Sequence, residues 1–253
     1  MGSILAVVNQ KGGVGKTTTA VNLTAALTEI GKHVLLCDFD PQANATSGLG
    51  IEKRTLKRSV YDVVINGTPA ADAIVHTQFG DVLPATADLA GAGVELVGME
   101  RPNHRLGEAL FPLKSSYDLI LIDCPPSLEL LTVNALAAAD GILVPVQCEY
   151  YALEGVSSLM NTVNRVKHAF NPGLDIEGVL LTMLDGRTNL GLQVVDEVKK
   201  HFRKKVFATT IPRNVRLGEA PSHGEPIHLY DPRSTGAEAY RSLAREVLAR
   251  NGK

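Results

Sequence analysis

The chain has 253 residues, of which 45% are hydrophobic and 21% are charged, and its formal net charge is −2. A chain of this length can bury a large core without disulfides or structural metals. Its nearly neutral charge excludes a uniformly basic surface, so any attraction to nucleic acid or to a membrane must come from a local patch.

The apolar run at residues 4–8 opens the chain and is too short for a signal sequence or a membrane span. We therefore expect a cytoplasmic protein without an N-terminal regulatory domain. Cys37, Cys124 and Cys148 are far apart and lack metal-ligand spacing, which is typical of reduced core thiols. The seven histidines form no HExxH-like cluster, so we expect no metal held by side chains alone.

Strand-like apolar runs alternate with helical patterns along the chain. Strands are predicted at 4–8, 33–38, 118–123, 141–146 and 176–183, and helices at about 16–30, 129–139, 153–169, 191–202 and 236–249. Residues 48–110 are less regular, with one strand expected near Val82. The alternation predicts an α/β fold, with a doubly wound, mostly parallel sheet flanked by helices. No linker or repeat interrupts it, so we expect one domain over 1–253.

A glycine-rich loop lies between the first strand and the first helix. Residues 9–18 read Asn-Gln-Lys-Gly-Gly-Val-Gly-Lys-Thr-Thr. Glycines allow positive φ and close approach to an anion, and the amino end of the helix adds positive potential. Lys16 can reach the β and γ phosphates, and the Thr17 hydroxyl can bind Mg²⁺. The predicted ATP-binding residues are Lys11, Gly12, Gly13, Val14, Gly15, Lys16, Thr17 and Thr18.

The loop departs from the pattern G-x-x-x-x-G-K-[ST] at its start. Gln10 replaces the first glycine, and a second lysine, Lys11, precedes the glycine run. Two close lysines repel each other weakly in solvent, but both are stabilised beside a triphosphate. Lys11 lies on the entrance side of the loop, so the nucleotide of a partner chain is its natural target.

Three aspartates follow predicted strands at their carboxyl ends, where doubly wound sheets bind ligands. Asp38 and Asp40 are two residues apart and project to the same side of an extended chain, and Asp123 ends the run 118–123. The alternative is that they only form turns at the strand ends.

The segments 11–18, 38–42 and 123–126 together resemble the deviant-Walker-A ATPases, a class of P-loop NTPase. Segments 145–155, 211–217 and 219–224 extend the likeness to the ParA/Soj chromosome-partitioning family. The resemblance covers essentially the whole chain, and these later segments are more specific than the phosphate loop.

The resemblance implies that ATP drives formation of a sandwich homodimer that hydrolyses ATP. Lys11 would reach the phosphates of the partner, Lys16 would bind the β and γ phosphates, and Asp40 would position the attacking water. Pro212 and Asn214, in the segment that matches the family's adenine loop, would contact the base.

The resemblance also implies a Mg²⁺ site and two macromolecular partners. Thr17 would ligate the ion, Asp123 would hold it through water, and Asp38 would support its shell. The ATP-bound dimer would coat non-specific double-stranded DNA on the nucleoid. A ParB-type centromere-binding protein would stimulate the weak hydrolysis and release the dimer.

A basic segment runs from residue 187 to residue 216, with eight Lys or Arg against two acidic residues, a local charge of +6. This asymmetry is typical of a surface that binds the DNA backbone, and the alternative is a solvated helix face with the loop that follows it. The resemblance implies DNA contacts for Arg187 and Arg216. Charge alone adds Lys199, Lys200 and Arg203.

Two other functions stay open from the sequence. A MinD-like membrane-surface ATPase would end in an amphipathic helix with large apolar residues, whereas residues 244–253 have mixed charge and no Phe or Trp. That composition argues against a membrane target. A metabolic ligase on the same fold would need a second substrate pocket, which the sequence does not exclude.

Overall fold

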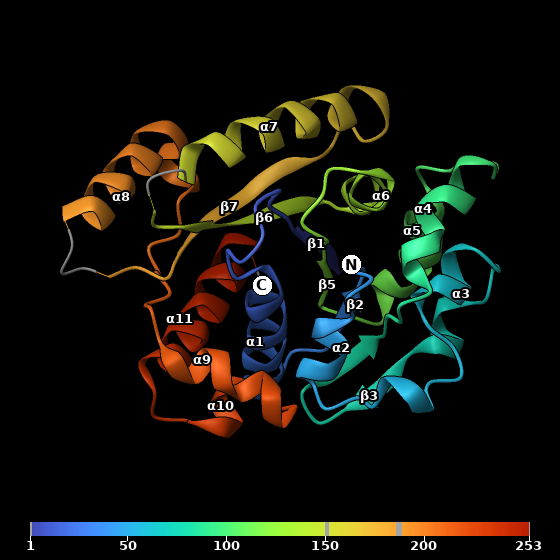
Figure 1. Ribbon diagram of the computed structural model, residues 1–253, viewed down its shortest axis with the longest axis horizontal. Helices are drawn as coiled ribbons and strands as arrows, with labels where there is room; N and C mark the ends of the chain where they lie inside the picture. Colours follow the sequence, from blue (N-terminus) through green and yellow to red (C-terminus); the bar gives the residue numbers. More distant parts are fainter. Residues whose placement is uncertain (1, 150–151, 186–188, 253) are drawn as a thin grey trace.

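The computed structural model describes residues 2–149, 152–185 and 189–252, and these residues form one seven-stranded sheet (Figure 1). The strand order is β3 (Val75–Thr77), β4 (Gly80–Leu83), β2 (Val34–Asp38), β5 (Leu119–Asp123), β1 (Ser3–Val7), β6 (Gly141–Gln147) and β7 (Asp175–Thr182). Neighbouring strands pair in parallel, except that β3 pairs antiparallel with β4. The mostly parallel, doubly wound sheet predicted from the sequence is confirmed.

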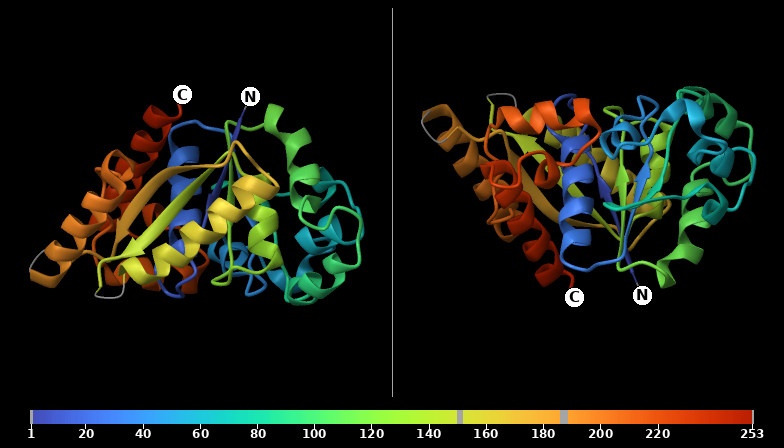
Figure 2. Two further views of the ribbon diagram at one scale, coloured as in Figure 1. Left: turned by 90° about the horizontal axis from the view of Figure 1, so that it is seen from above. Right: turned by 90° about the horizontal axis from the view of Figure 1, so that it is seen from below.

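Helices cover both faces of the sheet (Figures 1 and 2). The described α-helices are α1 (Lys16–Glu29), α2 (Asn44–Gly48), α3 (Val60–Val64), α4 (Leu89–Val97), α5 (Arg105–Leu110), α6 (Leu130–Ala138), α7 (Ala152–Ala169), α8 (Asn189–Phe202), α9 (Val215–Glu219), α10 (Ile227–Tyr230) and α11 (Thr235–Arg250). Helices α3 to α8 pack on one face, and α1, α9, α10 and α11 pack on the other.

Alternate residues of the strands supply the two cores. In β1, Ile4 and Ala6 point to the face of α3 to α8, while Leu5 and Val7 point to the face of α1 and α11. Both sets are buried, as expected of a parallel sheet covered on both sides.

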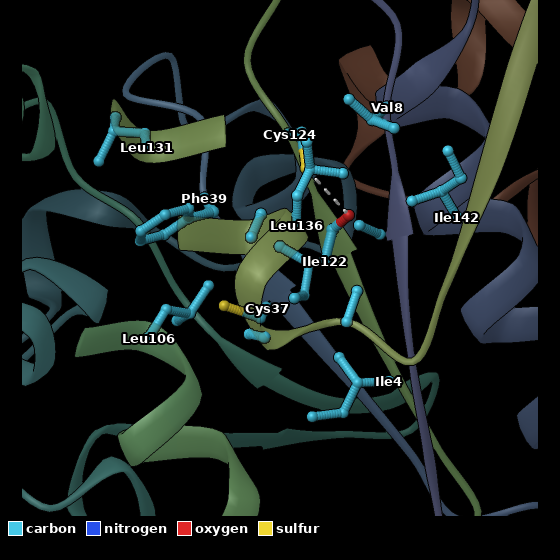
Figure 3. Packing of buried hydrophobic residues seen from close by; sticks show 14 of the residues in the cluster. Ile4, Val8, Cys37, Phe39, Leu106, Ile122, Cys124, Leu131, Leu136 and Ile142 are labelled. Carbon is cyan, nitrogen blue, oxygen red and sulfur yellow. Dashed lines mark hydrogen bonds between the residues drawn. The ribbon is translucent and has the colours of Figure 1, made fainter. Parts of the chain in front are cut away.

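The three cysteines are buried and free, as predicted. Cys37 and Cys124 belong to the core on the α3 to α8 face, close to Phe39 and Ile122 (Figure 3).

The five predicted strands and five predicted helices are all present, with ends that differ from the prediction by one or two residues. The irregular region 48–110 contains β4 at the strand expected near Val82, but it also contains α3, α4, α5 and the short edge strand β3.

Candidate nucleotide-binding site

The phosphate loop joins β1 to α1, which begins at Lys16 as predicted. Gly13 and Gly15 have φ values of 72° and 88°, in the left-handed region that favours glycine. Asn9 holds the start of the loop: its side-chain oxygen accepts the main-chain N–H of Lys11 at 3.0 Å, and its amide donates to the carbonyl of Pro145 at 2.7 Å. The loop is therefore tied to both β1 and β6.

The two lysines of the loop point to different partners. Lys16 is only 6% exposed, and its ammonium donates to the main-chain oxygen of Lys11 at 3.0 Å. Burial lowers the pKa of Lys16, while Asp123 and Asp40 act to raise it. Lys11, in contrast, has its ammonium 3.9 Å from a carboxylate oxygen of Glu149. The buried ammonium of Lys16 is thus placed to bind an anion within the loop. The ammonium of Lys11 points out of the loop, toward Glu149.

Asp123 ends β5 between the last residues of β1 and β2. Both of its carboxylate oxygens are buried, and neither has a hydrogen-bond partner within the described residues. Burial raises the pKa of Asp123 well above its usual range, and the nearby Asp38 adds to this, while the adjacent Thr17 hydroxyl and Lys16 act against it. A buried carboxylate without a partner is unstable by itself. Its two oxygens, with the hydroxyl of Thr17 at the start of α1, fit the hard oxygen ligands or water acceptors that Mg²⁺ requires.

Asp38 is fully buried, and its carboxylate is engaged by neighbours in the chain. One oxygen accepts both the N–H and the hydroxyl of Thr46 at 2.7 Å, and the other accepts the N–H of Asp40 at 3.3 Å. Burial raises the pKa of Asp38 to about 6, although the bonds from Thr46 lower it. Asp38 therefore fixes the turn that carries Asp40, and its part in the Mg²⁺ shell stays a prediction.

Asp40 lies in that turn and is 7% exposed. One of its oxygens accepts the N–H of Gln42 at 2.9 Å, and its charge acts on Lys16. The sequence assigned it to the nucleotide site, and the structure brings it to the phosphate loop.

A pocket of about 490 Å³ opens beside the loop. Gly15 and Thr18 form one wall, and the predicted base contacts Pro212 and Asn214 form another. The hydroxyl of Thr182, the last residue of β7, donates to the carbonyl of Val14 at 2.9 Å and so ties β7 to the phosphate loop.

The pocket also contains two charged residues that the sequence reasoning missed. Arg213 and Glu219 both line it. Arg213 also lies 3.4 Å from Glu149, the same carboxylate that Lys11 approaches. Arg213 stands between Pro212 and Asn214 in the chain, and this was the available signal for it.

The described residues of the basic segment lie toward both ends of β7. Lys205, which follows α8, pairs at 2.8 Å with Asp175, the first residue of β7. Thr182, the last residue of β7, instead lines the pocket beside Asn214. An eight-residue strand separates these ends by roughly 23 Å. The residues near the start of β7 are Lys199, Lys200, Arg203, Lys204 and Lys205.

Arg216, on α9, lies with the pocket end and therefore apart from that group. It pairs with Glu219 at 2.8 Å, and Lys200 pairs with Glu197 at 2.6 Å. Arg187 lies outside the described residues. The predicted DNA-contacting residues thus fall into at least two groups, because summed charge along a segment ignores which end of a strand each residue follows.

The glycine loop between β1 and α1, with Lys16 at its helix end and Asp123 on the adjacent strand, defines a P-loop nucleotide-binding protein of the doubly wound class. The sequence matches the AAA domain family over residues 2–176. It is 62% identical over 251 residues to the sporulation initiation inhibitor protein Soj of Bacillus subtilis, covering 98% of this chain and 99% of that protein. It is 55% identical to the chromosome-partitioning ATPase Soj of Thermus thermophilus, covering 97% and 95%.

A solved structure of cobyrinic acid a,c-diamide synthase from Mycobacterium smegmatis, with bound ADP and magnesium, superposes with a TM-score of 0.88. The two sequences are 38% identical, and the match covers 100% of this chain and 96% of the other. The chain belongs to the Soj/ParA family of chromosome-partitioning ATPases, which confirms the resemblance found in the sequence.

Proposed function

We propose that this chain is a cytoplasmic, nucleoid-associated ATPase that partitions DNA, acting as one domain over 1–253. The ATPase part is supported by the carboxylate of Asp123, which is buried beside the glycine loop and Lys16 and has no hydrogen-bond partner among the described residues. Mg²⁺, when bound, neutralises charge on the phosphates of ATP. Lys16 then holds the β and γ phosphates, and Asp40 orients the attacking water.

The proposed dimer rests on Lys11. Its ammonium points to Glu149 rather than into its own loop, as a lysine that acts on the nucleotide of a second copy requires. A cation supplied by the partner makes hydrolysis depend on dimerisation, in the way that an arginine finger does.

The proposed DNA partner is non-specific duplex, bound through phosphates by Arg216 and Arg187, with Lys199, Lys200 and Arg203 as a second group. A ParB-type protein releases the dimer by stimulating hydrolysis. No helix in the described part of the chain is long and apolar enough to cross a membrane.

The test is binding of non-specific duplex DNA without nucleotide, with ADP and with ATP, across a salt series. Binding that needs ATP and weakens with salt is expected. With about five phosphates contacted per dimer, the log–log slope should be near −4.5. Equal binding in all three conditions, or none, contradicts the DNA function.

The fold match to a diamide synthase makes a small-molecule ligase the second candidate. A ligase turns over ATP only with its own substrate, independently of DNA or a second protein. Phosphate release that a duplex and a ParB-type protein together accelerate favours partitioning, whereas acceleration by a carboxylic acid with an amine donor favours the ligase.

A further inference from the structure

Arg216 lies between two carboxylates. Its guanidinium is 2.8 Å from Glu219 and 3.7 Å from Asp231, and its side chain is 55% exposed. The hydroxyl of Tyr230 donates to the same oxygen of Glu219 at 3.2 Å. One cation between two anions leaves this point of the surface with a local charge of −1, which repels a DNA phosphate although the arginine itself is within reach of solvent.

Helix α9 carries Arg216, and the other four residues of this helix line the base pocket. Asn214 precedes the helix and Glu219 ends it, and both belong to the pocket wall. The side-chain oxygen of Asn214 accepts the N–H of Arg216 at 2.8 Å, and its amide donates to Thr235 at 3.0 Å. A ligand that contacts Asn214 therefore touches the residue that sets the backbone of Arg216.

The middle of α9 is held in place. Leu217 is buried against Gly236 at the start of α11, where a Cβ atom would come within 2.9 Å of the leucine side chain. The helix is thus anchored through Leu217, while Glu219 belongs both to the pocket lining and to the ion pair of Arg216.

We propose that the carboxylate of Glu219 competes with DNA phosphates for the guanidinium of Arg216. We further propose that a nucleoside in the base pocket breaks the Arg216–Glu219 ion pair and so frees Arg216 to bind DNA. This inference rests on the proposed function, since it takes Arg216 as a DNA contact. Glu219 can link the pocket to Arg216 because it lines the pocket and is also the carboxylate nearest to the guanidinium of Arg216. Engagement of the wall by a nucleoside then weakens the internal pair and lets the guanidinium bind a backbone phosphate.

The experiment compares Glu219→Gln with wild type in the full chain, by fluorescence anisotropy of a labelled non-specific duplex without nucleotide, with ADP and with ATP. Glu100→Gln, an exposed change of the same charge beyond α4, is the matched control. We expect Glu219→Gln to bind DNA without nucleotide at least about fivefold more tightly than the control. One more phosphate contact per chain should also make the salt slope steeper by about 0.9.

Because Glu219 lines the pocket, Asp231→Asn serves as a second variant that leaves the pocket wall intact. It should shift DNA binding in the same direction by a smaller factor, since its ion pair is longer. If wild type shows ATP-dependent DNA binding but both variants match Glu100→Gln, this inference is overturned alone. If wild type binds no DNA in any nucleotide state, the proposed DNA function is overturned, and the inference with it.

Discussion

The ammonium of Lys16 donates a hydrogen bond to the main-chain oxygen of Lys11, five residues earlier across the glycine loop. The loop thus bends around the ammonium of Lys16, the group proposed to bind phosphate, and the carbonyl of Lys11 lies within reach of it. The ammonium keeps further donors for phosphate, and the Lys11 side chain itself extends toward Glu149.

Lys16→Ala is expected to abolish binding of Mg·ATP, with a loss of affinity of at least about 100-fold, because it removes a charge-assisted contact with two phosphates. Isothermal titration with a non-hydrolysable ATP analogue measures the loss. Lys57→Ala removes an exposed lysine and should bind as wild type does. Unchanged affinity in Lys16→Ala would place the phosphates elsewhere.

Asp40→Ala should keep ATP and lose turnover by about 100-fold or more, since it removes the group that positions water and leaves the phosphate contacts in place. The ATP-bound dimer should then accumulate, as seen by light scattering. Asp88→Ala, at an exposed position before α4, is the control. A variant that stays monomeric with ATP contradicts the role given to Asp40.

Asp123→Asn should raise the free energy of unfolding in the absence of Mg²⁺ by about 1–3 kcal/mol, because it removes an ionisable carboxyl that is buried and accepts no hydrogen bond within the described part of the chain. The sign follows from the raised pKa: the ionised form is destabilised in the folded state. Urea unfolding with and without Mg·ATP measures both effects. The variant should also lose most of the extra stabilisation that Mg²⁺ gives together with ATP. Destabilisation without Mg²⁺ would show that Asp123 has a structural partner.

Thr46→Val tests the anchoring of the Asp40 turn. The Thr46 hydroxyl donates to Asp38 and accepts the N–H of Ala85 at 3.0 Å. Its loss leaves the buried N–H of Ala85 without an acceptor and leaves that Asp38 oxygen with only the main-chain N–H of Thr46. Urea unfolding should show a loss of about 2–3 kcal/mol. Thr24→Val is the matched control: it is equally buried, but its hydroxyl only donates to a carbonyl in its own helix, so about 1 kcal/mol or less is expected. Equal losses would remove the special role of the Thr46–Asp38 contact.

The sequence predicted the elements that carry the nucleotide site because their signals are local. The five-residue apolar strand, the glycines and the first turn at Lys16 are contiguous, and β2 and β5 are continuous apolar runs that end in aspartate. The partner of Asp38 was not predictable in this way, since Thr46 is brought back to it by a turn in which Ala43 adopts a φ of 53°.

The positions of the basic residues in the fold could not be predicted from the sequence, because they depend on contacts between distant segments. The charged residues of 199–205 and Arg216 are close in the sequence. In the fold, Lys205 lies at the first residue of β7, whereas Arg216 lies near the pocket at the last residue of that strand. The ion pair of Arg216 with Glu219 is a local i,i+3 pair within α9, whereas its contact with Asp231 depends on the packing of α9 against α10, which no local pattern encodes.

The most direct test is phosphate release per chain at saturating Mg·ATP over a series of protein concentrations, for wild type and for Lys11→Ala. If Lys11 acts on the nucleotide of a second copy, as proposed, the rate per chain of wild type should rise with concentration. Lys11→Ala should stay near background at every concentration while it still binds ATP. A wild-type rate per chain that is independent of concentration, and equal to that of Lys11→Ala, would contradict an ATPase that works as a dimer.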